Sequence, residues 1–443
     1  MVWMLLVACG SHSGRGREAK PVEISELGWQ LHDEMRSLVR VSWTQSQPAT
    51  VHVEYSFDEG IWESTPSVAY PAGSQERVVV GIPFETDAEW RVVVDGTETQ
   101  VEGETLTTGF LAAALPRCRV IVDEPDRYDR GERYLLTSIN EDGGGWTGGT
   151  YWTFLMDRQC RVVWATRTPE SHWTLFAQVS VTGDYLLWDE QTYWSDFGHG
   201  EESTVHKTWL DEEFEEVVTP GLHHEFVQLP DETLVWGSQA HGGGEALVEK
   251  GPEQIGETVL WTCDGDWPGA SWCESNGLYY AEATNSFLYS FYTNNSLVEV
   301  DRATGESMWW AGEVPGGYDF DPANSQFAWQ HGISTTDSDT LLVSSEWDGG
   351  NNGPTETWLL EYEVDHAQET LHLVWSDSSD TRADTNGQAW RLPNGNTLHV
   401  VGSASVIREV EAGHDDVWRV DFDGTRLLGY GAWVRDLYPL LKK

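Results

Sequence analysis

The sequence is poor in basic residues and has no long apolar run after its start. It contains 26 Lys and Arg against 73 Asp and Glu, a formal net charge of −47 over 443 residues. Phosphate backbones and anionic membrane surfaces repel such a chain, so we expect no nucleic-acid partner. Beyond the first ten residues, no stretch approaches the roughly 18 apolar residues of a membrane-spanning helix. We therefore expect the rest of the chain to be soluble.

Helical periodicity is also missing. No segment keeps the 3.6-residue apolar period of an amphipathic helix. The 25 Trp, 15 Tyr and 13 Phe occur instead among short alternating runs separated by Gly, Pro and Asp. We predict an all-β chain, long enough for two or three domains or for one large radial fold.

Cysteine is scarce, with five residues in the chain. Cys9 ends the apolar start MVWMLLVAC, which resembles the lipobox of bacterial lipoproteins. A lipid on Cys9 would be the only membrane attachment and would place the protein outside the cytoplasm, in a periplasm or at a cell surface. Residues 1–20 would then be signal and tether. The alternative is an apolar start by chance.

The other four cysteines form an even number, which suits an oxidising compartment. Cys263 and Cys273 enclose a short Gly/Pro/Trp loop and are a plausible disulfide, which leaves Cys118 with Cys160 as the second. A zinc site is the alternative, but no paired C-x-x-C occurs, and we expect no metal. Acidic stretches such as residues 319–324 and 420–425 carry oxygen ligands suited to calcium, yet neither completes a twelve-residue calcium loop.

Residues 21–114 alternate in short runs with turn signals between them, the pattern of a small β-sandwich. The runs are LVRVSW (38–43), TVHVEYSF (50–57), ERVVVGI (76–82) and EWRVVVDG (89–96). Trp43 and residues 81–92 resemble the fibronectin type III pattern.

From residue 115 to residue 443 one phrase returns six times, at intervals of about 50 residues. The copies are ERYLLTS (132–138), GDYLLWD (183–189), DETLVWG (231–237), NSFLYSF (285–291), SDTLLVS (338–344) and GNTLHVV (395–401). A period near 50 with about four strands per copy is typical of a β-propeller. We predict a six-bladed β-propeller preceded by the fibronectin type III-like β-sandwich.

The repeat also aligns three polar residues. Counting ten positions back from Leu234, Leu341 and Leu398 reaches His224, His331 and Gln388. Equivalent positions of a propeller lie at equivalent places around its axis, so these side chains are expected to face a common space. The alternative is that the histidines are structural, with backbone groups as their partners.

Four segments resemble the bacterial aryl-sulfate sulfotransferases. They are GLHHEFVQLPDETLVW (221–236), residues 276–310, FAWQHGISTTDSDTLLVSSE (327–346) and NGQAWRLPNGNTLHVVG (386–402). The resemblance implies a six-bladed propeller, often preceded by a β-sandwich. It also implies transfer of a sulfuryl group from an aryl sulfate to a phenol through a sulfated histidine, without cofactor or metal.

The resemblance assigns roles residue by residue. WQHGI places the nucleophile at His331, and HHEF places an oxyanion-stabilising histidine at His224 or, less well in register, His223. The W-x-H-x-N motif reads WCESN here, so Glu274 replaces a histidine while Asn276 is kept.

Two further positions bear on the charge of the expected site. Tyr292 stands where the family has an arginine. Arg391 lies in a register from which it could replace that charge, unless strand alternation turns it outward. Losing an anion-clamping arginine costs roughly 10³ to 10⁵ in rate. Two functions therefore stay open: an arylsulfotransferase-like enzyme that acts on small aryl sulfates or phenols, and a catalytically inactive surface-anchored propeller that binds a ligand or protein partner through its central funnel.

Overall fold

A computed structural model describes residues 20–143, 149–192, 202–211, 214–241, 244–347 and 355–442, so Cys9 lies outside the described residues. In these ranges the chain consists of β-strands, short 3-10 turns and one short α-helix, α1 (Cys263–Asp266). The prediction of an all-β chain is confirmed. No helix in the described ranges has the length and apolar character needed to cross a membrane.

The chain divides into two compact units. Among the described residues, the first comprises residues 20–30, Arg40–Val79 and Asp87–Leu106, and the second comprises Leu31–Val39, Val80–Thr86 and the described residues from Thr107 onward. Residues 31–39, 80–86 and 107–114, which the sequence placed in the sandwich, thus belong to the second unit. Hydrogen bonds account for this: Ser37 Oγ donates to the carbonyl oxygen of Val163 at 2.7 Å, and the Phe84 amide donates to that of Val162 at 3.0 Å.

The first unit contains two sheets. The first sheet has the order β1-β2-β6, with β1 (Ile24–Leu31), β2 (Val39–Gln45) and β6 (Gly73–Val79). The second has the order β4-β3-β7-β8, with β5 on β3 and β9 on β7: β3 (Ala49–Asp58), β4 (Ile61–Ser64), β5 (Val68–Tyr70), β7 (Asp87–Val94), β8 (Gln100–Glu102) and β9 (Leu106–Thr107). Alternate residues of β2, β3 and β7 are buried, among them Trp43 and Trp90, which are each 1% exposed. Two-residue alternation of this kind buries one face of each sheet.

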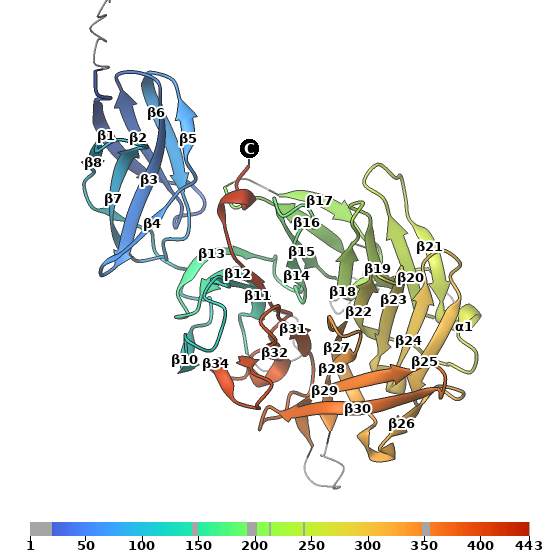
Figure 1. Cartoon of the computed structure of the whole chain (residues 1–443). Helices are drawn as coiled ribbons and strands as arrows, with labels where there is room; N and C mark the ends of the chain where they lie inside the picture. The colour runs from blue at the N-terminus through green and yellow to red at the C-terminus, as the bar shows by residue number, and fades with distance from the viewer. Residues whose placement is uncertain are drawn as a thin grey trace, which may run out of the picture. The chain divides into compact units, whose positions relative to one another are not determined.

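In the described part of the second unit, six sheets follow one another, each built on consecutive antiparallel strands (Figure 1). Three of them consist of four consecutive strands each. They are β14 (Ala177–Val179), β15 (Leu186–Glu190), β16 (Thr204–Thr208) and β17 (Glu215–Val218); β18 (Leu222–Gln228), β19 (Leu234–Ser238), β20 (Ala246–Lys250) and β21 (Thr258–Thr262); and β22 (Ser275–Ala281), β23 (Ser286–Phe291), β24 (Ser296–Asp301) and β25 (Ser307–Gly312).

The other three sheets each take an additional strand. β27 (Ala328–Thr335), β28 (Leu341–Trp347), β29 (Glu356–Asp365) and β30 (Thr370–Ser378) are joined by β26 (Asp319–Asp321). β31 (Gln388–Arg391), β32 (Thr397–Val401), β33 (Val406–Val410) and β34 (Asp416–Phe422) are joined by β10 (Cys118–Asp123). β11 (Tyr134–Asn140), β12 (Tyr151–Asp157) and β13 (Val162–Arg167) are joined by β35 (Ala432–Val434). Successive four-stranded antiparallel sheets of this kind are the architecture of a β-propeller.

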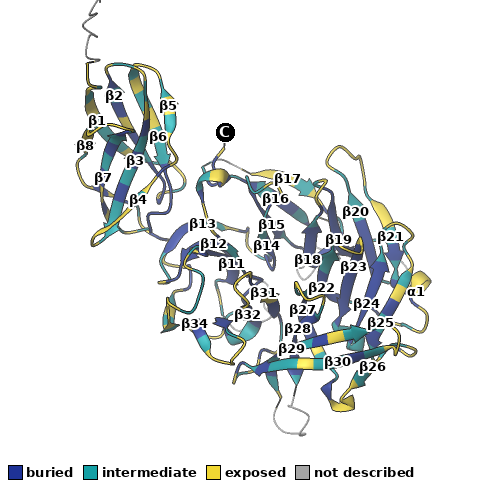
Figure 2. Cartoon of the chain, in the orientation of Figure 1, coloured by how far each residue is buried: buried dark blue, intermediate teal, exposed yellow. Residues whose placement is uncertain are grey.

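The strands of the second unit carry many buried residues (Figure 2), and apolar side chains from neighbouring sheets pack together in clusters. One cluster joins Val235 and Trp261 of the β18–β21 sheet to Phe287 and Tyr289 of the next sheet. The aromatic residues of the repeated phrases thus pack between sheets, as expected for a propeller. The two predicted disulfides, Cys118–Cys160 and Cys263–Cys273, are both present.

A buried ion pair links the first and last sheets of this unit. Arg158 Nη1 lies 3.0 Å from Glu409 Oε2, and their side chains are 6% and 0% exposed. The guanidinium also lies 3.8 Å from the ring centroid of Tyr128 and 3.9 Å from that of Trp433. Removing one member of such a pair leaves the other charge buried and unpaired.

We therefore expect Arg158→Met to lower the free energy of unfolding of the second unit by about 3–5 kcal/mol. The measurement is chemical denaturation of the two proteins side by side. Arg130→Met is the matched control, because Arg130 pairs with Asp126 at an exposed site where the side chains are 67% and 92% accessible. Equal stability of the two variants would contradict the assignment.

Candidate functional site

Three neighbouring sheets of the second unit place polar side chains at the start of their first strands. His223 and His224 lie at the start of β18, Asn276 lies in β22, and His331 lies in β27. Each strand loses its regular register there: between Leu222 and Phe226, between Ser275 and Gly277, and between Ala328 and Ile333. Bulges of this kind redirect side chains away from the usual alternation. His224 and Trp329 accordingly have positive φ values of 63° and 49°.

His331 is a buried imidazole, 8% exposed. Its Nδ1 lies 2.9 Å from the carbonyl oxygen of Trp329. A carbonyl oxygen only accepts, so Nδ1 carries the proton and Nε2 carries the lone pair. Burial lowers the pKa of His331 to about 4, partly opposed by this hydrogen bond. At neutral pH, His331 therefore holds an unprotonated Nε2, as a nucleophile requires.

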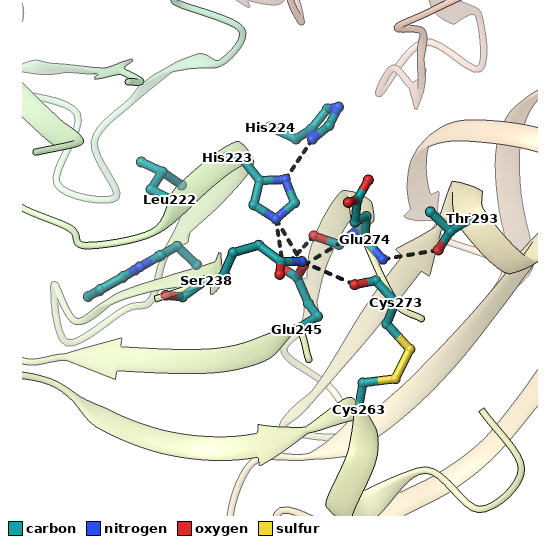
Figure 3. Close-up of polar contacts among 12 residues, drawn as sticks. Leu222, His223, His224, Ser238, Glu245, Cys263, Cys273, Glu274 and Thr293 are labelled. Carbon is teal, nitrogen blue, oxygen red and sulfur yellow. Dashed lines mark hydrogen bonds and ion pairs between the residues drawn. A yellow bond between two sulfur atoms is a disulfide. The ribbon is translucent and has the colours of Figure 1, made fainter. Parts of the chain in front are cut away.

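His223 contacts both His224 and a buried carboxylate (Figure 3). The two Nδ1 atoms are 2.9 Å apart, and His223 Nε2 lies 3.0 and 2.9 Å from the two oxygens of Glu245. The pKa of His224 lies well below its usual value. Burial is the main cause, and the nearby His223 and His331 lower it further. His331 and His224 therefore lie within electrostatic range of each other.

Glu274 and Tyr292, the two residues that depart from the family pattern, are hydrogen-bonded, with the Tyr292 hydroxyl donating to Glu274. The ring of Tyr292 lies 6.2 Å from that of His224 and 6.3 Å from that of Trp329, centroid to centroid. Trp329 is 51% exposed. An aromatic wall thus runs from the buried histidines to solvent, and a carboxylate lies beside it.

Asn276 and Gln388 hold backbone groups of the scaffold. Asn276 Nδ2 donates to the carbonyl oxygen of Gln330 at 2.5 Å, and its Oδ1 accepts from Ser290 Oγ at 2.9 Å. Gln388 Oε1 accepts from the Gly431 amide at 2.6 Å. These contacts give both side chains a role in shaping the site.

Arg391 is not brought to the histidines. Its guanidinium pairs with Glu361 of β29 and donates to the carbonyl oxygen of Gly395 at 3.1 Å. β29 is the third strand of its sheet, whereas His331 lies on the first. Arg391 therefore points toward Glu361 and away from the histidines, as expected if strand alternation turns it outward. Among the described residues, no arginine or lysine contributes to the lowered pKa of His331 or of His224.

Three buried acidic residues near the histidines, Glu245, Glu225 and Asp189, were not predicted from the sequence. Glu245 is fully buried and also accepts hydrogen bonds from Ser275 Oγ at 2.8 Å and from the Tyr289 hydroxyl. Burial raises the pKa of Glu225 well above its usual value and that of Asp189 to about 7. Glu225 adjoins the histidine pair in HHEF, which was a signal. Glu245 lies in an irregular connection that the repeat does not align.

The described residues of this site do not form a set of metal ligands. Within the described ranges, no group of three or more His, Cys, Asp or Glu side chains could hold a metal ion. The histidine nitrogens instead contact each other, a carboxylate and a backbone carbonyl. The site thus offers a neutral imidazole at His331, a second imidazole and aromatic surface.

No known protein family and no curated protein matches the sequence. Solved structures resemble it weakly. A periplasmic gluconolactonase, PpgL, from Pseudomonas aeruginosa shares 14% identity over 88% of this chain and 99% of its own, with a TM-score of 0.42. A putative 6-phosphogluconolactonase from Bacteroides uniformis shares 11% identity over 88% and 100%, with a TM-score of 0.41. The β-propeller domain of Cps50 (Swd1) from Myceliophteria thermophila shares 12% over 68% and 84%, with a TM-score of 0.39. Likeness at this level carries no argument about activity.

We expect His331 to remain neutral during a pH titration from 8 to 5, because burial holds its pKa near 4. Below about pH 4 it takes up a proton and Nε2 is lost as a nucleophile, whereas an unfolded histidine does so near pH 6.5. Because the unfolded chain binds this proton more tightly, lowering the pH from about 6.5 to about 4 lowers the free energy of unfolding. The measurement is NMR of histidine-labelled protein, with His331→Gln to assign the resonance. A midpoint near 6.5 in the folded protein would contradict the burial argument.

Proposed function

We propose that the second unit is a closed six-bladed propeller whose funnel carries the histidine site. Two observations support closure. Apolar clusters join the β11–β13 sheet both to the β31–β34 sheet and to residues that precede β14. The extra strands β10 and β35 come from opposite ends of this unit and add to the last and first sheets. Strand sharing of this kind would hold the ring shut.

We propose further that the site transfers a sulfuryl group from an aryl sulfate to a phenol through His331. The observation that carries this function is the hydrogen bond from Nδ1 of His331 to the carbonyl oxygen of Trp329. It orients a neutral imidazole with Nε2 as the lone-pair nitrogen, next to an aromatic wall. The resemblance of WQHGI to the aryl-sulfate sulfotransferases adds the choice of substrate.

The reaction has two displacements. In the first, Nε2 of His331 forms a bond to sulfur while the bond from sulfur to the phenolic oxygen breaks, and the donor leaves as a phenolate. In the second, the oxygen of an acceptor phenol forms a bond to sulfur, the N–S bond breaks to return neutral His331, and the acceptor's proton passes to a base of the site or to water. The transition states of such transfers are loose, so position and charge stabilisation supply most of the catalysis.

Charge stabilisation is the weak part of this site. Glu274 stands beside the aromatic wall, where its carboxylate would repel a sulfate ester, and Tyr292 replaces the arginine of the family. Analogous arginines contribute roughly 10³ to 10⁵ in rate. We therefore propose slow turnover.

The Glu274–Tyr292 contact also favours a second candidate function. A propeller that has lost its cationic groups could bind an uncharged aromatic ligand against Tyr292 and Trp329 without catalysis. This candidate is a catalytically inactive binding protein with the same funnel.

Location outside the cytoplasm is part of the proposal. The two disulfides support it, because such bonds persist in oxidising compartments. Lipid attachment at Cys9 would hold the protein at a bacterial membrane.

The test is release of 4-nitrophenol from 4-nitrophenyl sulfate in the presence of a phenol acceptor. We expect slow release by the wild-type protein and a loss of at least about 10²-fold in His331→Asn, which removes the nucleophile. His372→Asn is the matched control, because His372 lies in β30 and pairs with Asp321. Equal release by both variants, or none by the wild type, would reject the enzyme.

Glu274→Gln should increase this activity, because it removes a negative charge and keeps an acceptor for the Tyr292 hydroxyl. Relief of one like-charge contact near the site corresponds to about 1–3 kcal/mol, or roughly 5- to 150-fold in kcat/KM. Glu282→Gln, in the turn after β22, is the control for net charge. If the two substitutions act alike, Glu274 does not face the substrate. The binding protein is the better assignment if two results are found together. Neither Glu274→Gln nor Glu282→Gln releases 4-nitrophenol, and an uncharged phenol binds to the wild-type protein but not to Trp329→Ala.

A further inference from the structure

A chain of hydrogen bonds leads from His224 to a carboxylate in the interior of the second unit (Figure 3). It runs from His224 Nδ1 to His223 Nδ1 at 2.9 Å and from His223 Nε2 to Glu245 at 2.9 Å. His223 and Glu245 are fully buried, and His224 is 2% exposed. The chain therefore begins at the candidate site and ends where water does not reach.

Proton positions along this chain follow from the chemistry of the atoms. A nitrogen facing a carboxylate carries a hydrogen, so His223 Nε2 is protonated. Two Nδ1 atoms at 2.9 Å share one hydrogen. With His223 neutral, that hydrogen belongs to His224 Nδ1, and His224 Nε2 has the lone pair. With His223 cationic, the hydrogen belongs to His223, and His224 carries its own proton on Nε2.

We propose that His223, paired with the carboxylate of Glu245, receives a proton from His224 as His224 takes the proton of the acceptor phenol. His224 acts as the general base, and the two buried residues are positioning residues. The inference rests on the proposed sulfuryl transfer. As the acceptor oxygen bonds to sulfur, its proton moves to His224 Nε2, and the proton on His224 Nδ1 moves to His223 Nδ1. The N–S bond to His331 breaks, and the positive charge ends on His223 against Glu245.

The surroundings of Glu245 suit it to this task. Its oxygens accept from His223, from Ser275 Oγ at 2.8 Å and from the side chains of Tyr289 and Gln239. Burial raises the pKa of Glu245, but once His223 is protonated, its charge and these hydrogen bonds bring that pKa below its usual value. A carboxylate so held neutralises an imidazolium, and a buried pair without net charge is far less costly than a lone buried cation.

His224 by itself is poorly placed to keep the proton. Burial and the neighbouring His223 and His331 all disfavour a charge on it. Passing the proton inward separates the new positive charge from the reacting nitrogen of His331. A base with two nitrogens and a buried acceptor behind it can thus take a proton without remaining charged.

The experiment separates the two displacements in Glu245→Gln. Mixing enzyme with excess 4-nitrophenyl sulfate, without acceptor, reports the first displacement as a burst, and its leaving group needs no proton. Transfer is then measured to p-cresol, which must lose a proton, and to pentafluorophenol, which is already ionised. We expect an unchanged burst, a loss of about 10²-fold with p-cresol and less than threefold change with pentafluorophenol.

Glu299→Gln is the matched control. Glu299 is a carboxylate of β24, 7% exposed, that accepts from Ser286 and Trp309 and contacts no histidine in the described hydrogen bonds. It should behave as wild type with both acceptors. Equal losses with both acceptors in Glu245→Gln, or no loss with either, would overturn the relay.

A second measurement does not depend on turnover. Nitrogen-15 NMR of histidine-labelled wild-type protein distinguishes the two neutral forms of an imidazole. We expect the proton of His224 on Nδ1 and a proton on His223 Nε2; a neutral His224 protonated on Nε2 would overturn the relay. If the wild type gives no burst, sulfuryl transfer is rejected, and the NMR result still decides whether the proton chain exists.

Discussion

Backbone groups released by the bulges at the strand starts must find partners in the neighbouring sheets, because an unpaired buried amide or carbonyl is costly. Asn276 donates to the carbonyl oxygen of Gln330, and Tyr430 donates to that of Asn276 at 2.8 Å. Gln191 bonds both the amide and the carbonyl oxygen of His224 at 3.0 Å. Each irregular strand start is therefore held by the sheet beside it, and the sheets cannot shift independently.

The same constraint determines the state of the histidines. A bulge gives His331 access to the carbonyl oxygen of Trp329, two residues back, which fixes its tautomer. Close packing around it excludes water, which keeps the ring neutral. The neutral state of His331 and the stability of the scaffold thus have a common origin in the cross-sheet contacts. The described site has a nucleophile's geometry but lacks nearby cations, and this combination explains why both a slow enzyme and a binding protein remain consistent with it.

Sequence reasoning was strongest where periodicity governs the structure. Alternating runs and the 50-residue repeat predicted the strands, and both disulfides were paired correctly. The ten-residue register selected His224 and His331, which the structure places at the starts of two first strands. Arg391 could not be assigned from sequence, because one step of strand alternation decides which face it takes. Glu245 was missed because its four side-chain partners, His223, Gln239, Ser275 and Tyr289, lie apart in the sequence and no local pattern joins them.

Strand β35 joins the first sheet through the register pairs Tyr134–Val434 and Leu136–Ala432. Until the ribosome has added residues 432–434, that side of β11 is an open strand edge with unsatisfied amides. Open edges are sites of mispairing between chains. A chain that has not yet reached residue 434 therefore exposes an edge that can pair with other chains, and pairing with β35 is what covers it.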